Sequence, residues 1–427
     1  MSVSVPIPDA GRIAEGTLDG VDLQALAERV GTPCYVYSAT AIRQRIHAMQ
    51  TALQGLDARV CYAVKANSNL AILQLMANAG LGADIVSGGE LWRSLRAGIL
   101  ARRIVFSGVG KSADEIATAL DAGIARFNVE SADELHVLQR VAAERNVVAR
   151  ASARFNPDVD ARTHDKISTG KSENKFGVDI DEARAWFAES ARLSHVHLDG
   201  LHVHIGSQIL SLDPIRQALV RTADLWRELA AAGHAIASID VGGGLGVCYR
   251  EGHDQPVAIE AYAEVIRDTL AGFGGRILLE PGRWLVAEAG ILLTRVVRVK
   301  QGLQHRFLIV DAAMTELLRP SMYDAWHDIV ALTNPERPPQ IYDVVGPVCE
   351  TGDTFARDRE LPECEAGDLV MIRTTGAYGA SMASTYNSRP LAAEILVDAG
   401  RYAVIRRRQS FEDMIAGEQP ASDWEHP

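Results

Sequence analysis

The sequence predicts an α/β fold in which a (β/α)8 TIM-like barrel is followed by a C-terminal, mostly antiparallel β-barrel or β-sandwich domain. Between residues 40 and 285, eight short apolar runs alternate with helical segments, in the count and order of such a barrel. After Gly282 the pattern changes to β-branched or alternating runs with few helical patterns between them. A doubly wound open sheet is the alternative, but it rarely needs eight such units in a row.

Each predicted barrel strand is a short apolar run that ends in small or polar residues. The strands are expected at 59–65, 83–87, 104–107, 126–130, 147–155, 198–205, 238–242 and 276–280. The helices between them are expected at 71–79, 89–97, 113–122, 132–144, 181–190, 214–232 and 259–270. In such a barrel the carboxyl ends of the strands meet at one mouth, so the residues there are candidates for chemistry.

The second domain is predicted to be discontinuous in sequence. Its strands are expected at 291–300, 306–310, 340–345, 369–374 and 390–406. An early strand at 34–37, which follows a helix expected at 22–30, can join the same sheet. The expected bounds are therefore 40–285 for the barrel and 1–39 together with 286–427 for the β domain. The polar segment 158–175 follows the fifth barrel strand and is interpreted as a mobile lid.

The composition argues against several classes of function. The 427-residue chain is 47% hydrophobic and 23% charged and has a net charge of −12 with dispersed basic residues, so nucleic acid and anionic membranes are poor partners. The N-terminus lacks a signal-peptide pattern and no apolar run approaches roughly 20 residues, which favours a cytoplasmic protein. The cysteines form no C-x-x-C pair, which indicates reduced thiols: Cys34, Cys61, Cys248, Cys349 and Cys364.

Lys65 ends the first predicted barrel strand, within the run CYAVKANSN at 61–69. An unpaired ammonium is costly to bury in a strand, so a lysine at this place needs a reason. Arginine can supply a positive charge, but only lysine can lose its proton and attack a carbonyl carbon. The alternative interpretation is a strand-end lysine whose ammonium simply reaches solvent.

His202 and His204 are separated by one residue near the end of the sixth strand, so both imidazoles are expected on one side. They are interpreted either as metal ligands of a barrel hydrolase, or as one structural histidine beside one that packs against an aromatic ligand. A metal site needs further His or Asp ligands at other strand ends. The sequence mainly offers Glu130, Glu280 and Lys65 there, so no metal is expected.

Two turns after late strands suggest cofactor chemistry. The segment 242–246 (GGGLG) fails the dinucleotide pattern because Val247 stands where the third glycine belongs, but its bare N–H groups can cradle one phosphate. The alternative is a tight turn without a ligand. The motif EPGR at 280–283 places a carboxylate where it can keep a pyridine nitrogen protonated, and the alternative is a plain ion pair of Glu280 with Arg283.

Taken together, the motifs resemble the barrel-type pyridoxal-phosphate decarboxylases (fold III), and within them the diaminopimelate decarboxylases. The resemblance runs from about Gly31 to about Val397. The motifs that carry it are YAVKANSN (62–69), GADIVSGGEL (82–91), HIGSQI (204–209), DVGGGLG (240–246), EPGR (280–283), RPSMYDA (319–325), GPVCETGD (346–353), TTGAYG (374–379) and YNSRP (386–390). So many motifs in one order are far more specific than any of them alone.

The resemblance implies pyridoxal 5′-phosphate as the cofactor. Lys65 would carry it covalently, His204 would stack on its ring, and Glu280 would be the partner of its pyridine nitrogen. Ser207, Gly243, Gly244 and Tyr378 would neighbour its phosphate. The full set implied to bind it is Lys65, His204, Ser207, Gly243, Gly244, Glu280, Pro281, Gly282, Arg283 and Tyr378.

The resemblance also implies decarboxylation of meso-2,6-diaminopimelate to L-lysine in a homodimer. Cys349 would protonate the intermediate and Glu350 would hold the substrate's far ammonium, both across the subunit interface. The catalytic residues implied are Lys65, His204 and Cys349. The substrate-binding residues implied are Arg283, Arg319, Tyr323, Glu350 and Tyr378.

The chain departs from the family pattern at Trp284, Glu288, Ala313 and Leu391, and Trp284 is expected to affect the packing beneath Arg283. A related decarboxylase for another basic amino acid is the first alternative function. A barrel metallohydrolase that uses His202 and His204, and a silent cofactor-binding relative, are the others. The intact Lys65 and Cys349 argue against the silent relative.

Overall fold

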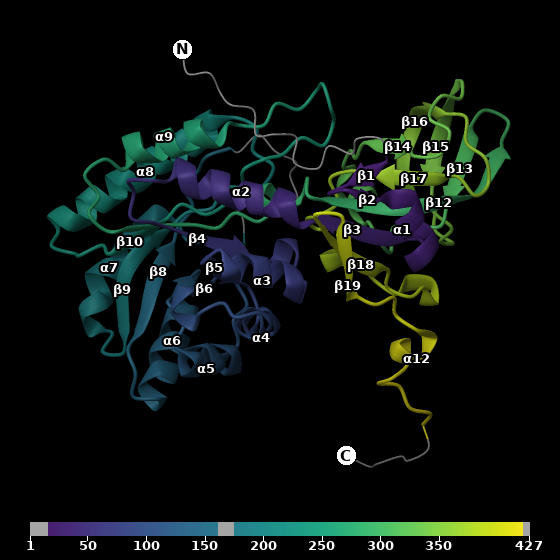
Figure 1. The fold of residues 1–427 in the computed structure, drawn as a ribbon. Coiled ribbons are helices and arrows are strands. Elements are labelled where there is room, and N and C mark those ends of the chain that lie inside the picture. The colour runs from purple at the N-terminus through teal and green to yellow at the C-terminus, as the bar shows by residue number, and fades with distance from the viewer. Residues whose placement is uncertain (1–15, 161–174, 422–427) are drawn as a thin grey trace. The chain divides into compact units, whose positions relative to one another are not determined.

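Figure 1 shows a computed structural model of the chain, which describes residues 16–160 and 175–421. The predicted lid at 158–175 falls almost wholly on residues 161–174, which lie outside the described residues. The described chain divides into two compact units. One comprises Ser38–Gly290 and Gly376–Ser381, and the other comprises 16–37, Ile291–Thr375 and 382–421.

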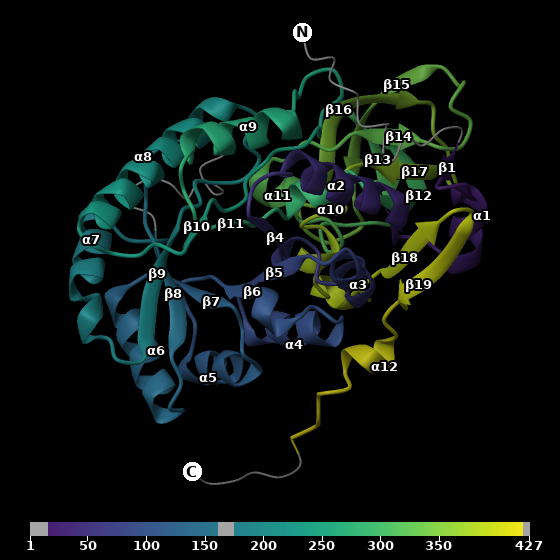
Figure 2. The ribbon, with the colours of Figure 1, turned by 60° about the vertical axis from the view of Figure 1, so that its left-hand side comes forward.

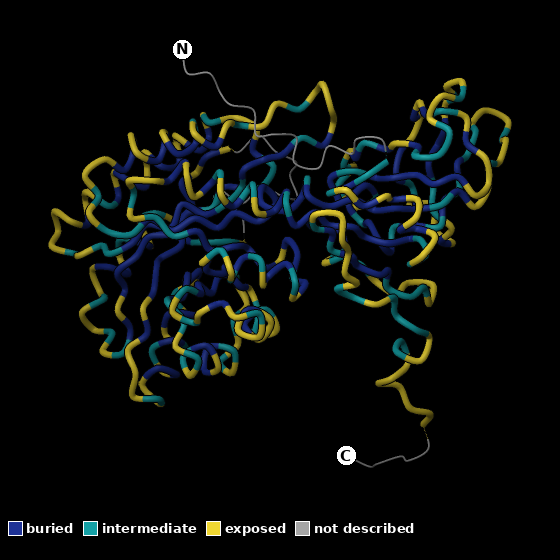
Figure 3. Tube along the Cα trace, viewed as in Figure 1, coloured by how far each residue is buried: buried dark blue, intermediate teal, exposed yellow. Residues whose placement is uncertain are grey.

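The first unit is a closed barrel of eight parallel strands in the order β10-β11-β4-β5-β6-β7-β8-β9, which confirms the predicted fold (Figure 1). The strands are β4 (Ala58–Ala63), β5 (Gly82–Ile85), β6 (Ile104–Phe106), β7 (Arg126–Val129), β8 (Ala149–Arg154), β9 (Val196–His202), β10 (Ser238–Asp240) and β11 (Arg276–Leu279). Each lies inside or within two residues of its predicted run. The trace in Figure 3 is buried along these strands, as expected for a filled barrel interior.

Helices surround the barrel strands (Figure 2). They are α2 (Ala39–Ala52), α3 (Leu70–Asn78), α4 (Gly88–Arg96), α5 (Ala113–Ala122), α6 (Ala132–Glu144), α7 (Ile180–Glu189), α8 (Leu212–Ala231), α9 (Ile259–Thr269) and the short α10 (Arg283–Val286). A serine begins several of them: the Ser87, Ser112 and Ser131 hydroxyls accept from backbone N–H groups of the first turn. These caps explain why the chain turns from strand to helix at fixed places. The sequence pattern did not single out α2.

The second unit is a nine-stranded sheet with the order β16-β15-β13-β12-β3-β18-β19, to which β17 is added beside β12 and β14 beside β17. Its strands are β3 (Cys34–Ser38), β12 (Gly290–Gln301), β13 (Arg306–Val310), β14 (Ile329–Ala331), β15 (Pro339–Val345), β16 (Thr354–Pro362), β17 (Leu369–Ile372), β18 (Ala393–Asp398) and β19 (Arg401–Arg406). The strand β12 pairs antiparallel with β13 and β17, as do β14 with β17, β15 with β16 and β18 with β19, whereas β13 and β15 are parallel. The early strand joins the sheet, as predicted.

The core of the second unit joins segments that are far apart in sequence. Buried side chains of α1 (Leu23–Val30) and of the short strands β1 (Thr17–Leu18) and β2 (Val21–Asp22) pack with β3, β12, β17 and β18. Asp22 caps α1 by accepting from the Ala25 N–H. Two helices complete this unit, α11 (Arg319–Tyr323) and α12 (Phe411–Met414). None of the described helices in either unit combines the length and apolar character needed to cross a membrane.

The prediction missed β14 and β16 for different reasons. The strand β14 has three residues, which is too short for an alternation to stand out. The strand β16 (TFARDRELP) is rich in charge, and Asp358 within it has a φ of 48° where its register with β15 shifts. Such a bulge interrupts the two-residue period on which a strand prediction depends.

Replacing Gly82 of β5 by alanine should destabilise the barrel. The added Cβ would lie 2.1 Å from the Arg103 carbonyl oxygen, and this backbone atom cannot yield without moving the entry to β6. We expect a lower melting temperature, equivalent to a loss of about 2 kcal/mol. The control is Gly110→Ala, whose Cβ would meet nothing within 4 Å. Equal melting temperatures for the two variants would contradict the prediction.

Candidate active site

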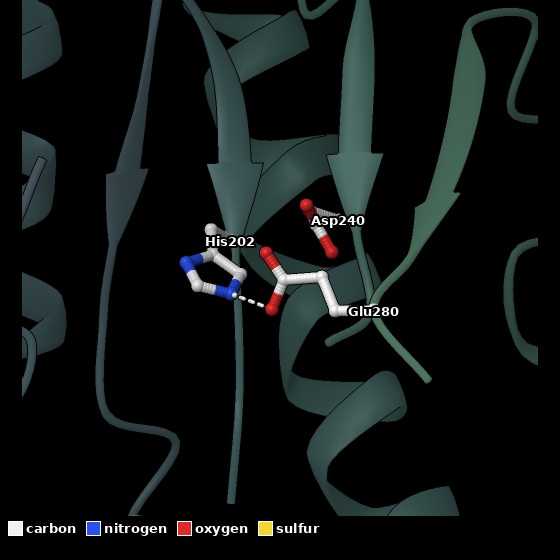
Figure 4. A group of neighbouring side chains, drawn as sticks. All are labelled: His202, Asp240 and Glu280. Carbon is white, nitrogen blue, oxygen red and sulfur yellow. Dashed lines mark hydrogen bonds and ion pairs between the residues drawn. The ribbon is translucent and has the colours of Figure 1, made fainter. Parts of the chain in front are cut away.

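Polar side chains gather at the carboxyl ends of the barrel strands. His202 is the last residue of β9, Asp240 is the last of β10, and Glu280 directly follows β11. Figure 4 shows these three side chains pointing toward one another from neighbouring strands. Lys65 lies in a single 3-10 turn, η1 (Val64–Ala66), directly after β4. The barrel therefore brings these strand-end residues to the same mouth.

Glu280 is a buried carboxylate with three hydrogen-bonding neighbours from other strands. Its Oε1 accepts from Asn128 Nδ2 at 3.0 Å and from Ser107 Oγ at 3.2 Å, and its Oε2 lies 3.2 Å from His202 Nε2. Burial disfavours the anion, but His202 and Lys65 outweigh burial and hold the pKa of Glu280 well below its usual range. Glu280 is therefore an anion at neutral pH.

Lys65 lies beside a second buried carboxyl group. Its Nζ is 3.5 Å from Asp84 Oδ2 of β5, and 42% of its side chain is exposed while that of Asp84 is completely buried. The surrounding protein disfavours the ammonium, but the charges of Asp84 and Glu280 prevail and raise the pKa of Lys65 above its ordinary value. Lys65 is therefore an ammonium at neutral pH, and the carboxyl groups of Asp84 and Glu280 lie near it.

Two further carboxyl groups under the mouth titrate near neutrality. Burial raises the pKa of Asp84 to about 7 and that of Asp240 to about 8, and in both cases the charge of Glu280 adds to the effect. Asp240 Oδ1 also accepts from the Gly242 N–H at 2.9 Å. Glu280 therefore carries a negative charge at neutral pH, while Asp84 and Asp240 are partly protonated.

The two histidines have opposite environments. His202 is 1% exposed, and although burial opposes its charge, Glu280 and Asp240 raise its pKa. Burial, together with Arg154 and Lys65, lowers the pKa of His204 well below its ordinary value. His204 Nδ1 accepts from the Gly243 N–H at 3.2 Å, so the ring is neutral with its proton on Nε2.

The metal interpretation that paired His202 with His204 is not supported. Within 16–160 and 175–421, the possible metal-ligating group at this mouth is His202, Asp240 and Glu280, and it does not include His204. His202 Nε2 is already engaged with Glu280, while His204 faces the glycine loop.

The glycine loop after β10 leaves no room for side chains. A Cβ on Gly243 would lie 2.2 Å from the Glu280 carbonyl oxygen, and one on Gly244 would lie 2.5 Å from the Gly206 carbonyl oxygen. Gly242 and Gly244 also have φ values of 68° and 107°, where side chains are strained. The loop backbone therefore packs directly against the backbone of Glu280 and Gly206 at the mouth.

Arg283 is the one arginine of the EPGR motif and is only 6% exposed. Its Nη2 and Nε donate to Ser207 Oγ at 3.0 and 3.3 Å, and its Nη1 donates to the Tyr249 hydroxyl. Its guanidinium also lies 4.8 Å from the ring centroid of Tyr378. The Tyr378 N–H donates to the Ala66 carbonyl next to Lys65, at 2.8 Å. These contacts tie the predicted phosphate neighbours to the mouth and to each other.

The residues at the mouth fit a pyridoxal phosphate group. A partly exposed primary amine, a buried anion, a neutral imidazole and a glycine loop are the partners that its aldehyde, ring nitrogen, ring face and phosphate need. The clearest structural sign is the close packing of the glycine loop, in which a Cβ at Gly243 would lie 2.2 Å from the Glu280 carbonyl oxygen. Lys65, His204, Glu280 and the glycine loop would hold the group when it is bound.

Sequence reasoning missed the residues that support this set. Asp84, Ser107 and Asn128 contact Lys65 or Glu280, but a polar residue inside or just after a strand carries no spacing signal of its own. Glu130 was counted as a strand-end carboxylate, but it accepts from Arg154 Nη1 of β8 at 2.8 Å. That pair is buried on both sides, so Glu130 has a structural partner.

The predicted substrate residues outside the barrel unit lie on two neighbouring segments of the second unit. Arg319 and Tyr323 are the ends of α11, and Arg319 is buried with its Nη1 2.7 Å from His327 Nε2. Cys349 and Glu350 are both exposed in the loop before β16. Ser321 Oγ of α11 donates to the Gly352 carbonyl of that loop at 2.6 Å, so the two segments touch.

Asp353 sets the conformation of the loop that carries Cys349. Its Oδ1 accepts from the Met314 N–H at 2.6 Å, and its Oδ2 accepts from the Val348 N–H at 2.8 Å. A Cβ on Gly346 would lie 2.3 Å from the same carboxylate, which explains the glycine at the start of the motif. The Cys349 N–H donates to Asn387 Oδ1 at 3.0 Å. The thiol is thus presented on a braced loop.

Trp284 and Glu288, two of the residues that depart from the family pattern, contact the same residue, Arg45. The guanidinium of Arg45, on α2, lies 4.7 Å from the centroid of the buried Trp284 ring and also forms an ion pair with Glu288. The Trp284 ring and the Glu288 carboxylate therefore share Arg45 of α2 as a partner. Trp284 packs against Arg45, whereas Arg283 contacts Ser207, Tyr249 and Tyr378.

Known proteins match this chain along nearly its whole length. The family model described as pyridoxal-dependent decarboxylase, pyridoxal binding domain, matches residues 39–287. The curated diaminopimelate decarboxylase of Pseudomonas aeruginosa is 50% identical over 407 residues, which cover 95% of this chain and 97% of that protein.

Solved structures agree with that match. The crystal structure of diaminopimelate decarboxylase from Helicobacter pylori complexed with L-lysine has a TM-score of 0.89 and 45% identity, and it covers 92% of this chain and 98% of the other. The M. jannaschii diaminopimelate decarboxylase in co-complex with L-lysine has a TM-score of 0.90 at 36% identity, covering 95% and 96%. A barrel mouth with Lys65 beside Asp84 and Glu280, and relatives this similar over this length, place the chain in the pyridoxal-dependent decarboxylases and, within them, in the diaminopimelate decarboxylase family.

Proposed function

We propose that the chain decarboxylates meso-2,6-diaminopimelate to L-lysine and CO2 and thereby completes lysine synthesis. The observation that carries the proposal is the barrel mouth, in which the amine of Lys65 stands beside the buried anion of Glu280. The 50% identity with a curated diaminopimelate decarboxylase over 95% of the chain supports this substrate.

Pyridoxal phosphate, when bound, supplies an electron sink for the carbanion that loss of CO2 leaves behind. Lys65 is the residue to carry it, because it is a primary amine at the barrel mouth whose side chain is exposed in part, beside the buried carboxyl group of Asp84. Glu280 would hold the proton on the ring nitrogen, because its own pKa is kept low by His202 and Lys65. The neutral imidazole of His204 would cover the ring face.

The phosphate would be held by uncharged donors beside one cation. Gly243, Gly244 and the Ser207 hydroxyl are proposed as its neighbours, with Tyr378 and the guanidinium of Arg283 at its edge. The motif residues Pro281 and Gly282 fix the turn between Glu280 and Arg283: a Cβ on Gly282 would lie 3.0 Å from Ala66 Cβ, next to Lys65.

The substrate's ends are assigned to the second unit and to Arg283. Arg319, Tyr323 and Arg283 are proposed to bind carboxylates, because a guanidinium offers a planar fork that matches them. Glu350 would hold the far ammonium. Cys349, exposed on the braced loop, would deliver a proton to the carbanion.

A homodimer in the cytoplasm is part of the proposal. The exposure of Cys349 and Glu350 supports their use by the site of a partner subunit in a two-fold dimer. We also propose that the domains have the bounds 40–285 and 1–39 with 286–427.

The covalent role of Lys65 has a direct test. Borohydride reduction of the holoenzyme, followed by peptide mapping, should place a pyridoxyl group on Lys65. Lys65→Arg keeps the charge but not the nucleophile, so its rate of CO2 release should fall below about a thousandth of the parent rate. A label elsewhere, or an active Lys65→Arg variant, would contradict the assignment.

Substrate choice is tested by CO2 release from meso-diaminopimelate beside lysine, ornithine and arginine. We expect the first to be preferred, and Glu350→Gln to raise its KM by about tenfold to a hundredfold, because one charge-assisted contact to the far ammonium is lost. Equal or better turnover of another amino acid would contradict the proposed substrate and favour the alternative function, a related decarboxylase for another basic amino acid.

The shared site is tested with two inactive variants. Cys349→Ala should keep the cofactor's visible spectrum and lose about a hundredfold or more in rate, because the acid is missing. Mixed dimers of Cys349→Ala with Lys65→Ala should regain about a quarter of the parent activity, since half of the dimers form one intact site. The control mixes Lys65→Ala with a double variant that carries both Lys65→Ala and Cys349→Ala. It should restore no activity, because neither subunit then supplies Lys65. No recovery in the first mixture would exclude a site shared across subunits.

A further inference from the structure

The barrel has a second cluster of charge at the opposite ends of its strands. Arginines stand at the beginning of four strands: Arg59 in β4, Arg126 in β7, Arg150 in β8 and Arg276 in β11. A fifth, Arg102, lies in the single turn η2 (Ala101–Arg103) that leads into β6. Lys65 and Glu280 lie beyond the other ends of β4 and β11, so this cluster is separate from the mouth.

These five arginines line one cavity of about 820 Å³, which we call the basal cavity. Asp57 is the one acidic residue that lines it. The cavity wall also includes Trp226 and Phe273, whose rings meet edge to face at 5.1 Å. The chain as a whole has a net charge of −12, so a local excess of arginine does not follow from its composition.

Carboxylates account for three of the five guanidinium groups. Arg126 and Arg150 share Asp199, with Arg126 Nη2 3.0 Å from its Oδ1, and Arg276 binds both oxygens of Asp57 at 3.0 and 3.1 Å. Arg126 also donates to Ser152 Oγ at 2.8 Å. These pairs explain three arginines as parts of the closed barrel floor.

Arg59 and Arg102 are not explained in this way. Within residues 16–160 and 175–421, neither has a carboxylate at ion-pair distance, and Arg59 Nη1 donates only to the Arg102 carbonyl oxygen at 3.1 Å. Burial, together with the charges of Arg276 and Arg103, lowers the pKa of Arg59, while the charges of Cys61 and Asp57 oppose the shift. Two cations therefore line one cavity without a described carboxylate at ion-pair distance.

We infer that the basal cavity is a binding site for a small polyanion that carries two or more phosphate or carboxylate groups. Guanidinium groups bind such oxyanions through paired N–H donors, and Arg59 and Arg102 have donors to spare. The aromatic wall of Trp226 and Phe273 would accept an apolar part of the same molecule. The ligand would bind outside the catalytic mouth and stabilise the barrel by mass action.

The test is calorimetric titration of the holoenzyme with pyrophosphate and, separately, with citrate. The bound cofactor keeps both anions out of the phosphate cradle at the mouth. We expect saturable binding of at least one anion, weakened by added salt. Arg102→Gln should reduce its affinity by about tenfold, and Arg59→Gln with Arg102→Gln by about a hundredfold, because charge-assisted hydrogen bonds are lost.

The control is Arg192→Gln, an exposed arginine that pairs with Glu189 on the outer surface. It should bind both anions as the parent does. All three variants should decarboxylate at the parent rate, since none alters the mouth. Arg102 is exposed and has no side-chain partner among the described residues, so its variant should fold even if the double variant does not. The two anions distinguish a phosphorylated ligand from a polycarboxylate. Absent binding, or equal affinity in Arg102→Gln and the parent, overturns the inference.

Discussion

The burial of Glu280 as an anion is the interaction on which the barrel mouth depends. A lone carboxylate in a dry interior costs several kcal/mol, and its pKa rises until it is neutral. Here a charged His202 and the donors of Ser107 and Asn128 reverse that outcome. Because these partners come from β6, β7 and β9, the charge of one side chain couples the closure of the barrel to its chemistry.

The charge of Glu280 also affects the pKa values of two neighbouring carboxyl groups, Asp84 and Asp240. Burial raises the pKa of Asp84 to about 7 and that of Asp240 to about 8, and the charge of Glu280 adds to both shifts. At the other end of the strands, five arginines line the basal cavity together with Asp57. The charges of the residues that line this cavity therefore sum to a positive value.

The barrel could be predicted from the sequence because short strand runs alternate with helices, several of which a side chain caps, as with β5 and the Ser87 cap of α4. Its strand-end residues followed from that frame alone. The partners of Glu280 did not, because Ser107 and Asn128 are recognised only when separate strands are brought together. The strand β16 could not be predicted either, because the bulge at Asp358 interrupts its two-residue period. Roles for Cys349 and Glu350 came from the resemblance, since neither has a neighbour pattern that indicates chemistry.

The chain crosses between its two units several times, and this has a consequence for its synthesis. It leaves the barrel unit at Gly290 and returns with Gly376–Ser381, where the Tyr378 N–H binds the Ala66 carbonyl beside Lys65. The interval is 376 − 290 = 86 residues, or roughly 4–17 s at a ribosome's pace of about 5–20 residues per second. During that time all eight barrel strands have been made while the segment that closes over Lys65 has not. The nascent barrel therefore becomes a complete cofactor site only after most of the sheet of the other unit has been translated.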